Sequence, residues 1–388
     1  MKKQFYFFSV VLLTIGSVMG LSSCSKDDDD NDYDANSAQA AAVVAQFVDH
    51  TVTPTYTALA AKAELLADQL AALKENATDA GVRQACTTFL EARAEWERSE
   101  AFLYGAAGDF GIDPHIDSWP LSETDFNTLM ASPAMLNALD GEDGDAYAGD
   151  HLGNALLGFH GIEYILFANG QPKAASLITD LEWIYVVAVA GDLRNRCYQL
   201  EVSWIGDDAP ASHIEKLDDL EMQYTLGGSD ASYGDNIKNA GKAGSTYSSM
   251  TAALMQIARG CIDIADEVGS SKIGAAFTGE NVNYIESPYS QMSITDFLNN
   301  LKSIENAYMG GVENDRDESL SLHSYIHSID ANLDAKVLEA LESAQAAVGN
   351  MPVPFVNNIS AQQNGVAMEA CAELSSVMEQ VVDALRNN

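Results

Sequence analysis

Apolar and polar residues follow a helical period over most of this chain. Alanine-rich segments repeat apolar positions at spacings of three and four residues, the pattern of a helix with one face packed inward. Eight such segments cover residues 37–73, 79–104, 151–168, 174–202, 245–268, 294–309, 320–348 and 360–385. The two-residue alternation of half-buried strands is scarce. The pattern therefore predicts an all-α fold.

Helix-breaking residues subdivide this pattern. Pro54 interrupts the first segment, where we expect the helix to kink or divide. Thr78 and Ser293 are typical helix starts, whereas Gly170 and Gly310 are typical helix ends. Helices joined in this way favour bundles, in which a site is built from side chains that face the interior.

Length and composition predict two domains. About 360 residues follow the N-terminal leader described below, more than one ordinary core accommodates. The polar, glycine-rich stretch 227–244 separates two sets of about four helices. We therefore expect one bundle over residues 37–228 and another over 245–388. Residues 105–149 and 269–293 are expected to be long loops with a functional role or no fixed structure.

The N-terminus predicts export. Two lysines precede an apolar run over residues 5–21, the layout of a signal peptide and too short for a transmembrane span. Leu21-Ser22-Ser23-Cys24 resembles a bacterial lipobox, so we expect residues 1–23 to be removed and Cys24 to be lipidated. The acidic residues 24–36 form either a solvated tether or a tag resembling that of Bacteroides-type surface lipoproteins. The predicted location is the outer membrane, reached through the lipid anchor.

The charge of the chain limits its partners. The formal net charge is −37, and loss of the leader removes Lys2 and Lys3 but no acid, which gives −39. Such a field repels nucleic acid and anionic membrane surfaces and attracts cations. Nucleic acid is therefore excluded as a partner.

Four cysteines remain after Cys24, and each lies in a helical segment without a CxxC motif. An exported chain permits disulfides, but the long spacings favour buried free thiols or one disulfide over a cysteine metal site. These cysteines are Cys86, Cys197, Cys261 and Cys371.

One hexapeptide carries the most specific chemistry. Gly158-Phe159-His160-Gly161-Ile162-Glu163 lies within an apolar run. His160 and Glu163 are three residues apart and share one face of a helix, which suits a metal-ligand pair or an acid/base pair. Titratable groups in such surroundings need partners, because an unpaired buried charge is costly.

The hexapeptide and its neighbours resemble the GxHxxE signature of the imelysin family. Further stretches agree with the family in order: residues 93–102 (RAEWERSEAF), 117–121 (DSWPL), 286–293 (ESPYSQMS), Asp296-Phe297 and 304–310 (IENAYMG). Together they span most of the mature chain. The resemblance implies two four-helix bundles related by duplication, with a site near their interface.

The same resemblance implies a metal-related function. The family has been classed with metallopeptidases, and its relatives include periplasmic iron-uptake components. Oxygen and imidazole ligands suit iron, although zinc or another divalent metal stays open. We expect His160 and Glu163 to form the site with Glu100 or Glu286. The expected partners are iron or an iron-bearing small ligand, together with uptake components of the outer membrane or periplasm.

Five residues of these motifs are expected to support the site. Arg93 lies seven residues before Glu100, so the two are expected to pair on one helix face. The other supporting residues are Gly158, Trp119, Ser287 and Ser290.

Two other function classes stay open. A metallopeptidase would need a third ligand and a base beyond His160 and Glu163, and the chain contains no HExxH motif. The third alternative is a structural or partner-docking surface lipoprotein without metal. In that case His160 and Glu163 would belong to a hydrogen-bond network that ties the bundles together.

His323 and His327 form a second constellation with helical i, i+4 spacing. This spacing suits metal chelation, but Tyr325 and Ile326 give the segment an apolar side. Surface or packed histidines are therefore the favoured interpretation.

Overall fold

The computed structural model describes residues 29–388, with side chains from residue 37 onward. The expected leader 1–23 and the lipidation site Cys24 lie outside the described residues. Helix α1 begins at Asp29, so residues 29–36 of the expected tether are helical. Among the described residues, no helix is both long and apolar enough to cross a membrane.

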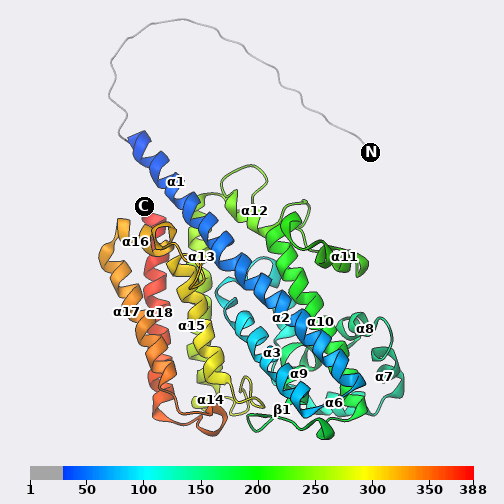
Figure 1. Cartoon of the computed structure of the whole chain (residues 1–388). Helices are drawn as coiled ribbons and strands as arrows, with labels where there is room; N and C mark the ends of the chain where they lie inside the picture. Colours follow the sequence, from blue (N-terminus) through cyan, green and yellow to red (C-terminus); the bar gives the residue numbers. More distant parts are fainter. Residues whose placement is uncertain (1–28) are drawn as a thin grey trace, which may run out of the picture.

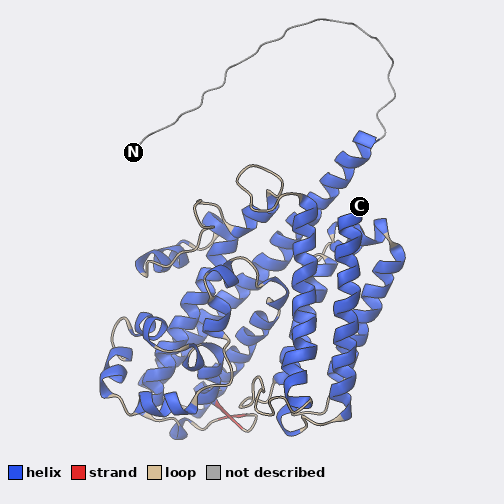
Figure 2. Cartoon of the chain, turned by 180° about the vertical axis from the view of Figure 1, so that it is seen from behind, coloured by secondary structure: helices blue, strands red, loops and turns tan. Residues whose placement is uncertain are grey.

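Residues 29–238 contain twelve α-helices and one short hairpin. They are α1 (Asp29–Phe47), α2 (Thr53–Glu75), α3 (Asp79–Glu97), α4 (Ala106–Asp109), α5 (Ile112–Ile116), α6 (Glu123–Met130), α7 (Pro133–Leu139), α8 (Gly144–His151), α9 (Gly158–Leu166), β1 (Phe167–Ala168), β2 (Gln171–Pro172), α10 (Asp180–Ile205), α11 (Ala211–Asp219) and α12 (Tyr233–Lys238). The strands pair antiparallel, with Phe167 opposite Pro172. Figure 2 shows this strand pair in red among blue helices and the loops that connect them.

The remaining part contains six α-helices. They are α13 (Met250–Glu267), α14 (Gly274–Phe277), α15 (Ser293–Met309), α16 (Leu322–Ile329), α17 (Ala331–Gly349) and α18 (Gln362–Asn387). Two π-helical segments, Val48–Val52 and Val268–Ile273, adjoin α2 and α13, respectively. Short 3₁₀ turns occupy Glu100–Phe102, Asn154–Leu156, Ala175–Leu177, Gly206–Asp208, Glu318–Leu320 and Phe355–Asn357. The all-α fold is confirmed.

The long helices form two groups that lie side by side (Figure 1). In the first group, α10 packs against α2 and α9, and α3 packs against α2 and α9. In the second group, α18 packs against α13 and α17, and α15 packs against the same two helices. Helix α15 also contacts α3, while α13 contacts the Glu100–Phe102 turn. These contacts join the two groups along the centre of the molecule.

Helix α1 crosses from one group to the other. The chain changes from α1 to α2 through the π-helical segment Val48–Val52, and Pro54 lies in the first turn of α2. Helix α1 packs against α13 and α16 of the C-terminal part and against α12, and its Phe47 ring contacts Phe102. Residues 37–47, which the expected N-terminal bundle includes, therefore contact both parts of the chain.

The expected loop over residues 105–149 is wrong. This stretch folds into the five short helices α4–α8. Each has four to eight residues, too few for a repeating apolar pattern to be visible in the sequence. The second expected loop, 269–293, is helical up to Phe277, and its remaining residues approach the first group of helices.

The boundaries of the longer helices follow the capping residues. The Thr78 hydroxyl accepts a hydrogen bond from Gly81 N at 3.1 Å, and α15 begins at Ser293. Gly310 ends α15 with φ of 80°, a left-handed conformation that favours glycine. These starts and ends agree with the sequence prediction.

Cys86, Cys197, Cys261 and Cys371 are all buried free thiols. Burial raises the pKa of each thiol, to about 12 for Cys86. Of the two alternatives for these four residues, free thiols are therefore confirmed.

Candidate metal and ligand site

A buried arginine lies at the centre of the candidate site. Arg93, on α3, is 1% exposed and forms ion pairs with three carboxylates. One guanidinium nitrogen contacts Asp117. The other, Nη2, lies 2.5 Å from both Glu97 Oε1 and Glu286 Oε1. Since Glu286 belongs to the C-terminal part of the chain, this guanidinium bridges the two groups of helices.

Asp117 follows α5 and receives three different donors. Trp96 Nε1 donates to its Oδ2 at 2.6 Å, His160 Nε2 lies 3.0 Å from its Oδ1, and Arg93 contacts the same Oδ1. Burial would raise the pKa of Asp117, but the charge of Arg93 and the hydrogen bond from His160 outweigh burial and hold the pKa well below its usual range. Asp117 is therefore an anion.

Gly158 allows His160 to approach Asp117. It starts α9 with φ of +64°, and a Cβ there would lie only 1.8 Å from Ile116 O at the end of α5. Only glycine permits this close approach between α9 and α5. The supporting role expected for Gly158 thus has a geometric basis.

Glu163 holds His160 and a segment of the C-terminal half together. Its Oε2 lies 3.3 Å from His160 Nδ1, and its Oε1 accepts hydrogen bonds from Tyr289 N at 3.1 Å and Ser290 N at 2.7 Å. Both carboxylate oxygens are thus engaged, and the contact joins α9 to the 286–290 segment. Glu163 orients the imidazole and ties the halves together.

The imidazole of His160 lies between two carboxylates. Burial alone would lower its pKa, but hydrogen bonds to Asp117 and Glu163 outweigh burial and raise the pKa to about 9. At neutral pH His160 is therefore an imidazolium that donates from both ring nitrogens. A metal would have to displace one of these protons before it could bind.

Lys272 supplies a second buried cation from the π-helical segment after α13. Its Nζ lies 3.1 Å from Glu286 Oε1, 3.4 Å from Glu100 Oε1 and 3.5 Å from Glu97 Oε2. Burial would lower the pKa of Lys272, but these surrounding acids raise it well above its usual value. Lys272 and Arg93 therefore neutralise part of a dense group of carboxylates.

Several of these acids hold their protons more strongly than usual. Burial, opposed only in part by Arg93 and Lys272, raises the pKa of Glu97 to about 7. Burial also raises the pKa of Glu100 well above normal, against the opposing effect of Lys272. For Asp113, burial and the neighbouring charge of Asp117 raise the pKa to about 7. The cluster contains more acid than its internal cations neutralise.

Within residues 37–388, two sets of donor atoms are close enough to hold a metal ion. In each set, one atom per residue lies within 4.8 Å of the others. One set is Asp117, His160 and Glu286, and the other is Glu97, Glu100 and Asp117. Glu286 is fully buried, and its Oε2 has no hydrogen-bond partner among the described residues. This free acceptor is a suitable ligand atom for a cation.

A cleft of about 240 Å³ leads from the surface to this cluster. Trp119 and Tyr284 form part of its wall, with ring centroids 3.8 Å apart. The charged lining consists of Glu100, Asp113, Asp117, Glu267 and Lys272. Trp119 therefore lines the cleft, and its side chain offers no ligand atom for a metal.

The two serines expected to support the site shape its C-terminal segment. Ser287 has φ of 50°, and its Oγ donates to Asp296 Oδ2 at 2.5 Å. Ser290 offers its backbone N–H to Glu163. Nearby, Ser293 Oγ donates to Glu286 O at 2.5 Å. These contacts fix the backbone that places Glu286 beside Arg93.

The structure brings His160, Glu286, Glu100 and Arg93 into one buried cluster, but the expected Arg93–Glu100 pair is wrong. Helix α3 ends at Glu97, and Glu100 lies in the following 3₁₀ turn, so the seven-residue spacing no longer holds the two on one face. Arg93 pairs with Glu97 instead, and Glu100 faces Lys272.

The expected site did not include Asp117, Glu97 or Lys272, which contact its residues directly. Asp117 stands in the DSWPL stretch, which the family resemblance already contained, and Glu97 lies four residues after Arg93 on the same helix. Those two signals could have identified both residues. Lys272 had no comparable signal, because only the packing of the second π-helical segment brings it to the acids.

His323 and His327 are linked to each other through an acid. Their Nδ1 atoms lie 2.6 Å and 2.9 Å from the two oxygens of Asp334, which also accepts a hydrogen bond from Tyr308 at 2.9 Å. His323 is partly buried and His327 is largely exposed. Both belong to a packing network between α15, α16 and α17.

Comparison with known proteins identifies relatives along nearly the whole chain. An iron-regulated protein A from Synechococcus elongatus is 26% identical over 341 residues, which cover 87% of this chain and 84% of that protein. A crystal structure from Parabacteroides distasonis, described as an iron-regulated protein A precursor, superposes with a TM-score of 0.76 at 27% identity, covering 90% of this chain and 95% of the other.

A more distant structure shares the fold. The imelysin-like protein of Psychrobacter arcticum superposes with a TM-score of 0.59 at 14% identity, covering 90% of this chain and 93% of the other. The model of the imelysin family matches residues 52–381. This match includes every residue of the buried cluster, and the chain belongs to the imelysin family.

Proposed function

We propose that the buried cluster binds an iron ion, or the iron of a small iron-bearing ligand, for bacterial iron uptake. The observation that carries this proposal is the convergence of Asp117, His160 and Glu286 from three distant segments, with donor atoms within 4.8 Å of one another. The unpartnered Glu286 Oε2 adds a free ligand atom. The names of two relatives, which refer to iron regulation, are consistent with an iron-related role.

The chemistry of these donors suits a transition metal. Carboxylate oxygens and an imidazole nitrogen accept iron, and they also accept zinc. Asp117 and Glu286 would supply charge, while His160 would bind through Nε2 after losing a proton. Glu163 would then hold the opposite ring nitrogen and fix the orientation of the ring, which is a positioning role.

Arg93 and Lys272 compete with an incoming metal ion for the carboxylate of Glu286. Arg93 Nη2 and Lys272 Nζ lie 2.5 Å and 3.1 Å from the same Glu286 oxygen. A bound ion would displace at least one of these contacts and the His160 proton. Binding should therefore release protons and should weaken as the pH falls.

Metal content of the purified, tag-free protein tests this proposal. We expect about one iron per chain in the wild type and at least a tenfold loss of affinity in His160→Ala and Glu286→Gln. His115→Ala is the matched control, because His115 pairs with Asp192 at 2.8 Å and not with a residue of the cluster. This variant should bind iron as the wild type does. Equal, negligible iron in the wild type and both site variants would refute the proposal. Parallel titrations with zinc decide which metal is preferred.

Export and uptake require a separate test in cells. We propose that Cys24 carries a lipid that anchors the protein to the outer membrane, where uptake components receive the iron. A strain that lacks the protein should grow more slowly under iron limitation, and the wild-type sequence should restore growth better than Cys24→Ala. Identical growth of all strains would reject the uptake role while leaving metal binding untouched.

A further inference from the structure

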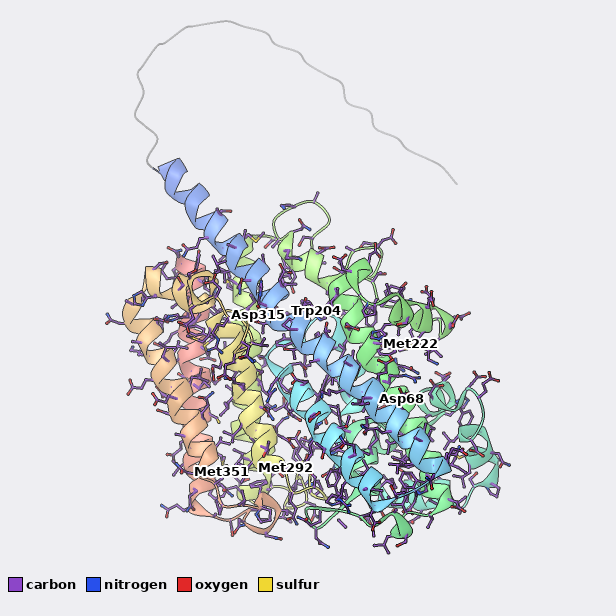
Figure 3. The ribbon with its side chains drawn as sticks, viewed as in Figure 1. Asp68, Trp204, Met222, Met292, Asp315 and Met351 are labelled. Carbon is purple, nitrogen blue, oxygen red and sulfur yellow. The ribbon has the colours of Figure 1, made fainter. Side chains whose placement is uncertain are left out.

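A second cavity lies where the C-terminal end of α10 meets the start of α2 and helix α12. It has a volume of about 570 Å³, within the range of small-molecule pockets. None of its lining residues belongs to the buried cluster described above. Figure 3 shows this separation, since Trp204 of the cavity and Met292, beside the 286–290 segment, are far apart along the molecule. We call this cavity the α10 pocket.

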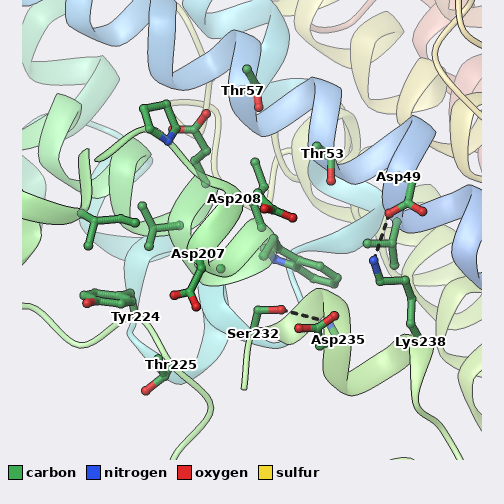
Figure 4. A pocket seen from close by; sticks show the side chains of 18 of the residues that line it. Asp49, Thr53, Thr57, Asp207, Asp208, Tyr224, Thr225, Ser232, Asp235 and Lys238 are labelled. Carbon is green, nitrogen blue, oxygen red and sulfur yellow. Dashed lines mark hydrogen bonds and ion pairs between the residues drawn. The ribbon is translucent and has the colours of Figure 1, made fainter. Parts of the chain in front are cut away.

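The α10 pocket is strongly acidic. Its lining contains one basic residue, Lys238, whose Nζ is already paired with Asp49 at 3.1 Å. Figure 4 shows that pair at one side of the pocket, with Asp207 and Asp208 on the other. The acidic lining residues are Asp49, Glu201, Asp207, Asp208, Asp230 and Asp235. Glu201 is already paired with His213 at 2.5 Å and Asp49 with Lys238, so four acids, Asp207, Asp208, Asp230 and Asp235, have no ion-pair partner among the described residues and favour a cationic ligand.

The backbone adds to this negative potential. The 26-residue helix α10 ends at Ile205, and its last residues line the pocket. Helix C-termini carry partial negative charge from carbonyl groups without intrahelical partners. Gly206 turns the chain with φ of 73°, so the 3₁₀ turn that follows places Asp207 and Asp208 next to this helix end.

Trp204 adds an unsatisfied donor to the same lining. Its side chain is 2% exposed, and its indole N–H has no acceptor among the described residues. A buried donor without a partner is destabilising, so a ligand oxygen that accepted this hydrogen bond would remove that cost. A simple ammonium ion offers no such acceptor.

The arrangement of the acids disfavours a bare metal ion. Within the described part of the chain, the acids of the α10 pocket nowhere bring three ligand atoms within 4.8 Å of one another, unlike the two clusters around Asp117. Carboxylates spread around a cavity of this volume suit an extended organic cation, which makes separate ion pairs and hydrogen bonds.

We propose that the α10 pocket binds a small organic ligand that carries at least one ammonium group and a hydroxyl or carbonyl oxygen. The ammonium pairs with Asp207 and Asp208, and the oxygen accepts the Trp204 N–H. A basic peptide and an amino sugar both have this chemistry. This site is independent of the proposed metal site.

Calorimetric titration of the full mature chain with three probes tests the proposal. Trilysine is a peptide with carbonyl oxygens, glucosamine is an amino sugar with hydroxyls, and spermidine is a polyamine without oxygen. We expect trilysine or glucosamine to bind, and whichever binds identifies the source of the ligand. Trilysine should bind more tightly than spermidine, which has a comparable positive charge, and binding should weaken several-fold between low and physiological salt.

Two substitutions separate the charge and the hydrogen bond. Asp207→Asn/Asp208→Asn, at exposed positions, should lower affinity for the bound probe about tenfold, and Trp204→Phe should lower it about fivefold. The control Glu342→Gln/Glu379→Gln removes the same charge from exposed positions on α17 and α18 and should bind as the wild type does.

Four outcomes would overturn the proposal. They are binding of neither oxygen-bearing probe, spermidine binding as tightly as trilysine, equal affinity in the Asp207→Asn/Asp208→Asn variant and its control, and binding of calcium alone. Because the two aspartates are exposed, their replacement should not unfold the protein, and circular dichroism confirms that each variant is folded.

Discussion

At the scale of single residues, Arg93 is the cation on which the buried carboxylates depend. It contacts Asp117, Glu97 and Glu286, and all four side chains are at most 5% exposed. A buried ion pair contributes little net stability over apolar packing, but removal of one partner leaves an uncompensated charge. The charge of Arg93 is therefore more important than its packing.

Replacement of Arg93 by methionine should lower the free energy of unfolding by about 3–5 kcal/mol, because three acids lose their shared cation. Urea unfolding of the metal-free protein at neutral pH measures this change. Arg98→Met is the control, since the Arg98 side chain, which pairs with Glu95, is 37% exposed. This replacement should lower the free energy of unfolding by less than about 1 kcal/mol. Similar losses in both variants would contradict this account.

Asp113 makes the stability of the protein depend on pH. Its pKa of about 7 in the folded state exceeds the usual value of 3.8, so the folded state binds the proton more tightly. Stability from this group is therefore fully present below about pH 4 and is lost as the pH rises through 7.

The variant Asp113→Asn should not show this loss of stability at higher pH. Between pH 4.5 and pH 7.5 the wild type should lose about 1–2 kcal/mol more than the variant, a figure reduced for partial solvent access. Urea unfolding at the two pH values measures the difference. Asp150→Asn, at an exposed position on the end of α8, should behave as the wild type does. Parallel pH profiles for the wild type and Asp113→Asn would disprove the assignment.

At the scale of elements, the start of α9 depends on one glycine. A Cβ on Gly158 would meet Ile116 O at 1.8 Å, and the positive φ adds strain for any other residue. This close approach of α9 to α5 brings His160 to Asp117. The GxHxxE signature thus contains a backbone requirement in addition to its two titratable residues.

The substitution Gly158→Ala should therefore destabilise the protein by more than about 3 kcal/mol or prevent folding. Gly153→Ala is the matched control five residues earlier, where φ is −75° and a Cβ would meet nothing within 4 Å. Gly153→Ala should change the free energy of unfolding, measured by thermal unfolding, by less than about 1 kcal/mol. Equal melting temperatures for the two variants would mean that the α5–α9 contact can relax.

At the scale of the whole molecule, polar and steric contacts join the two groups of helices. Arg93 reaches Glu286, and Glu163 reaches the amides of Tyr289 and Ser290. Close packing adds to these bonds, because Gly260 of α13 approaches Ala101 O in the first half of the chain, where a Cβ would lie at 1.9 Å. The relative position of the halves therefore determines the geometry of the site.

Gly260→Ala should push the halves apart and lower the melting temperature by several degrees. Hydrogen exchange should increase in both α13 and the Glu100–Phe102 turn, because the contact belongs to both. Gly349→Ala, at the end of α17 with nothing within 4 Å of its Cβ, is the control. Faster exchange in α13 alone would indicate a local defect rather than a separation of the halves.

The sequence by itself determined the long helices, their capped ends and the family. Apolar periodicity and residues such as Thr78 and Gly310 act locally, so they are visible without a structure. The same holds for the pairing of His160 with Glu163, which needs only one turn of helix. The short helices α4–α8 were missed because each is shorter than the period that reveals a helix.

Only the tertiary structure decided which residues share the site. Glu286 reaches Arg93, and Lys272 reaches Glu97 and Glu100, across the interface between the two groups of helices and over more than 170 residues of the chain. The tertiary structure also showed that Glu163 orients His160 and that Asp117 belongs to both sets of donor atoms. Burial and charge pairing depend on every neighbour in space, and sequence spacing specifies only neighbours along a helix. Local sequence motifs therefore indicate the kind of chemistry at the site, whereas tertiary packing determines which residues come together there.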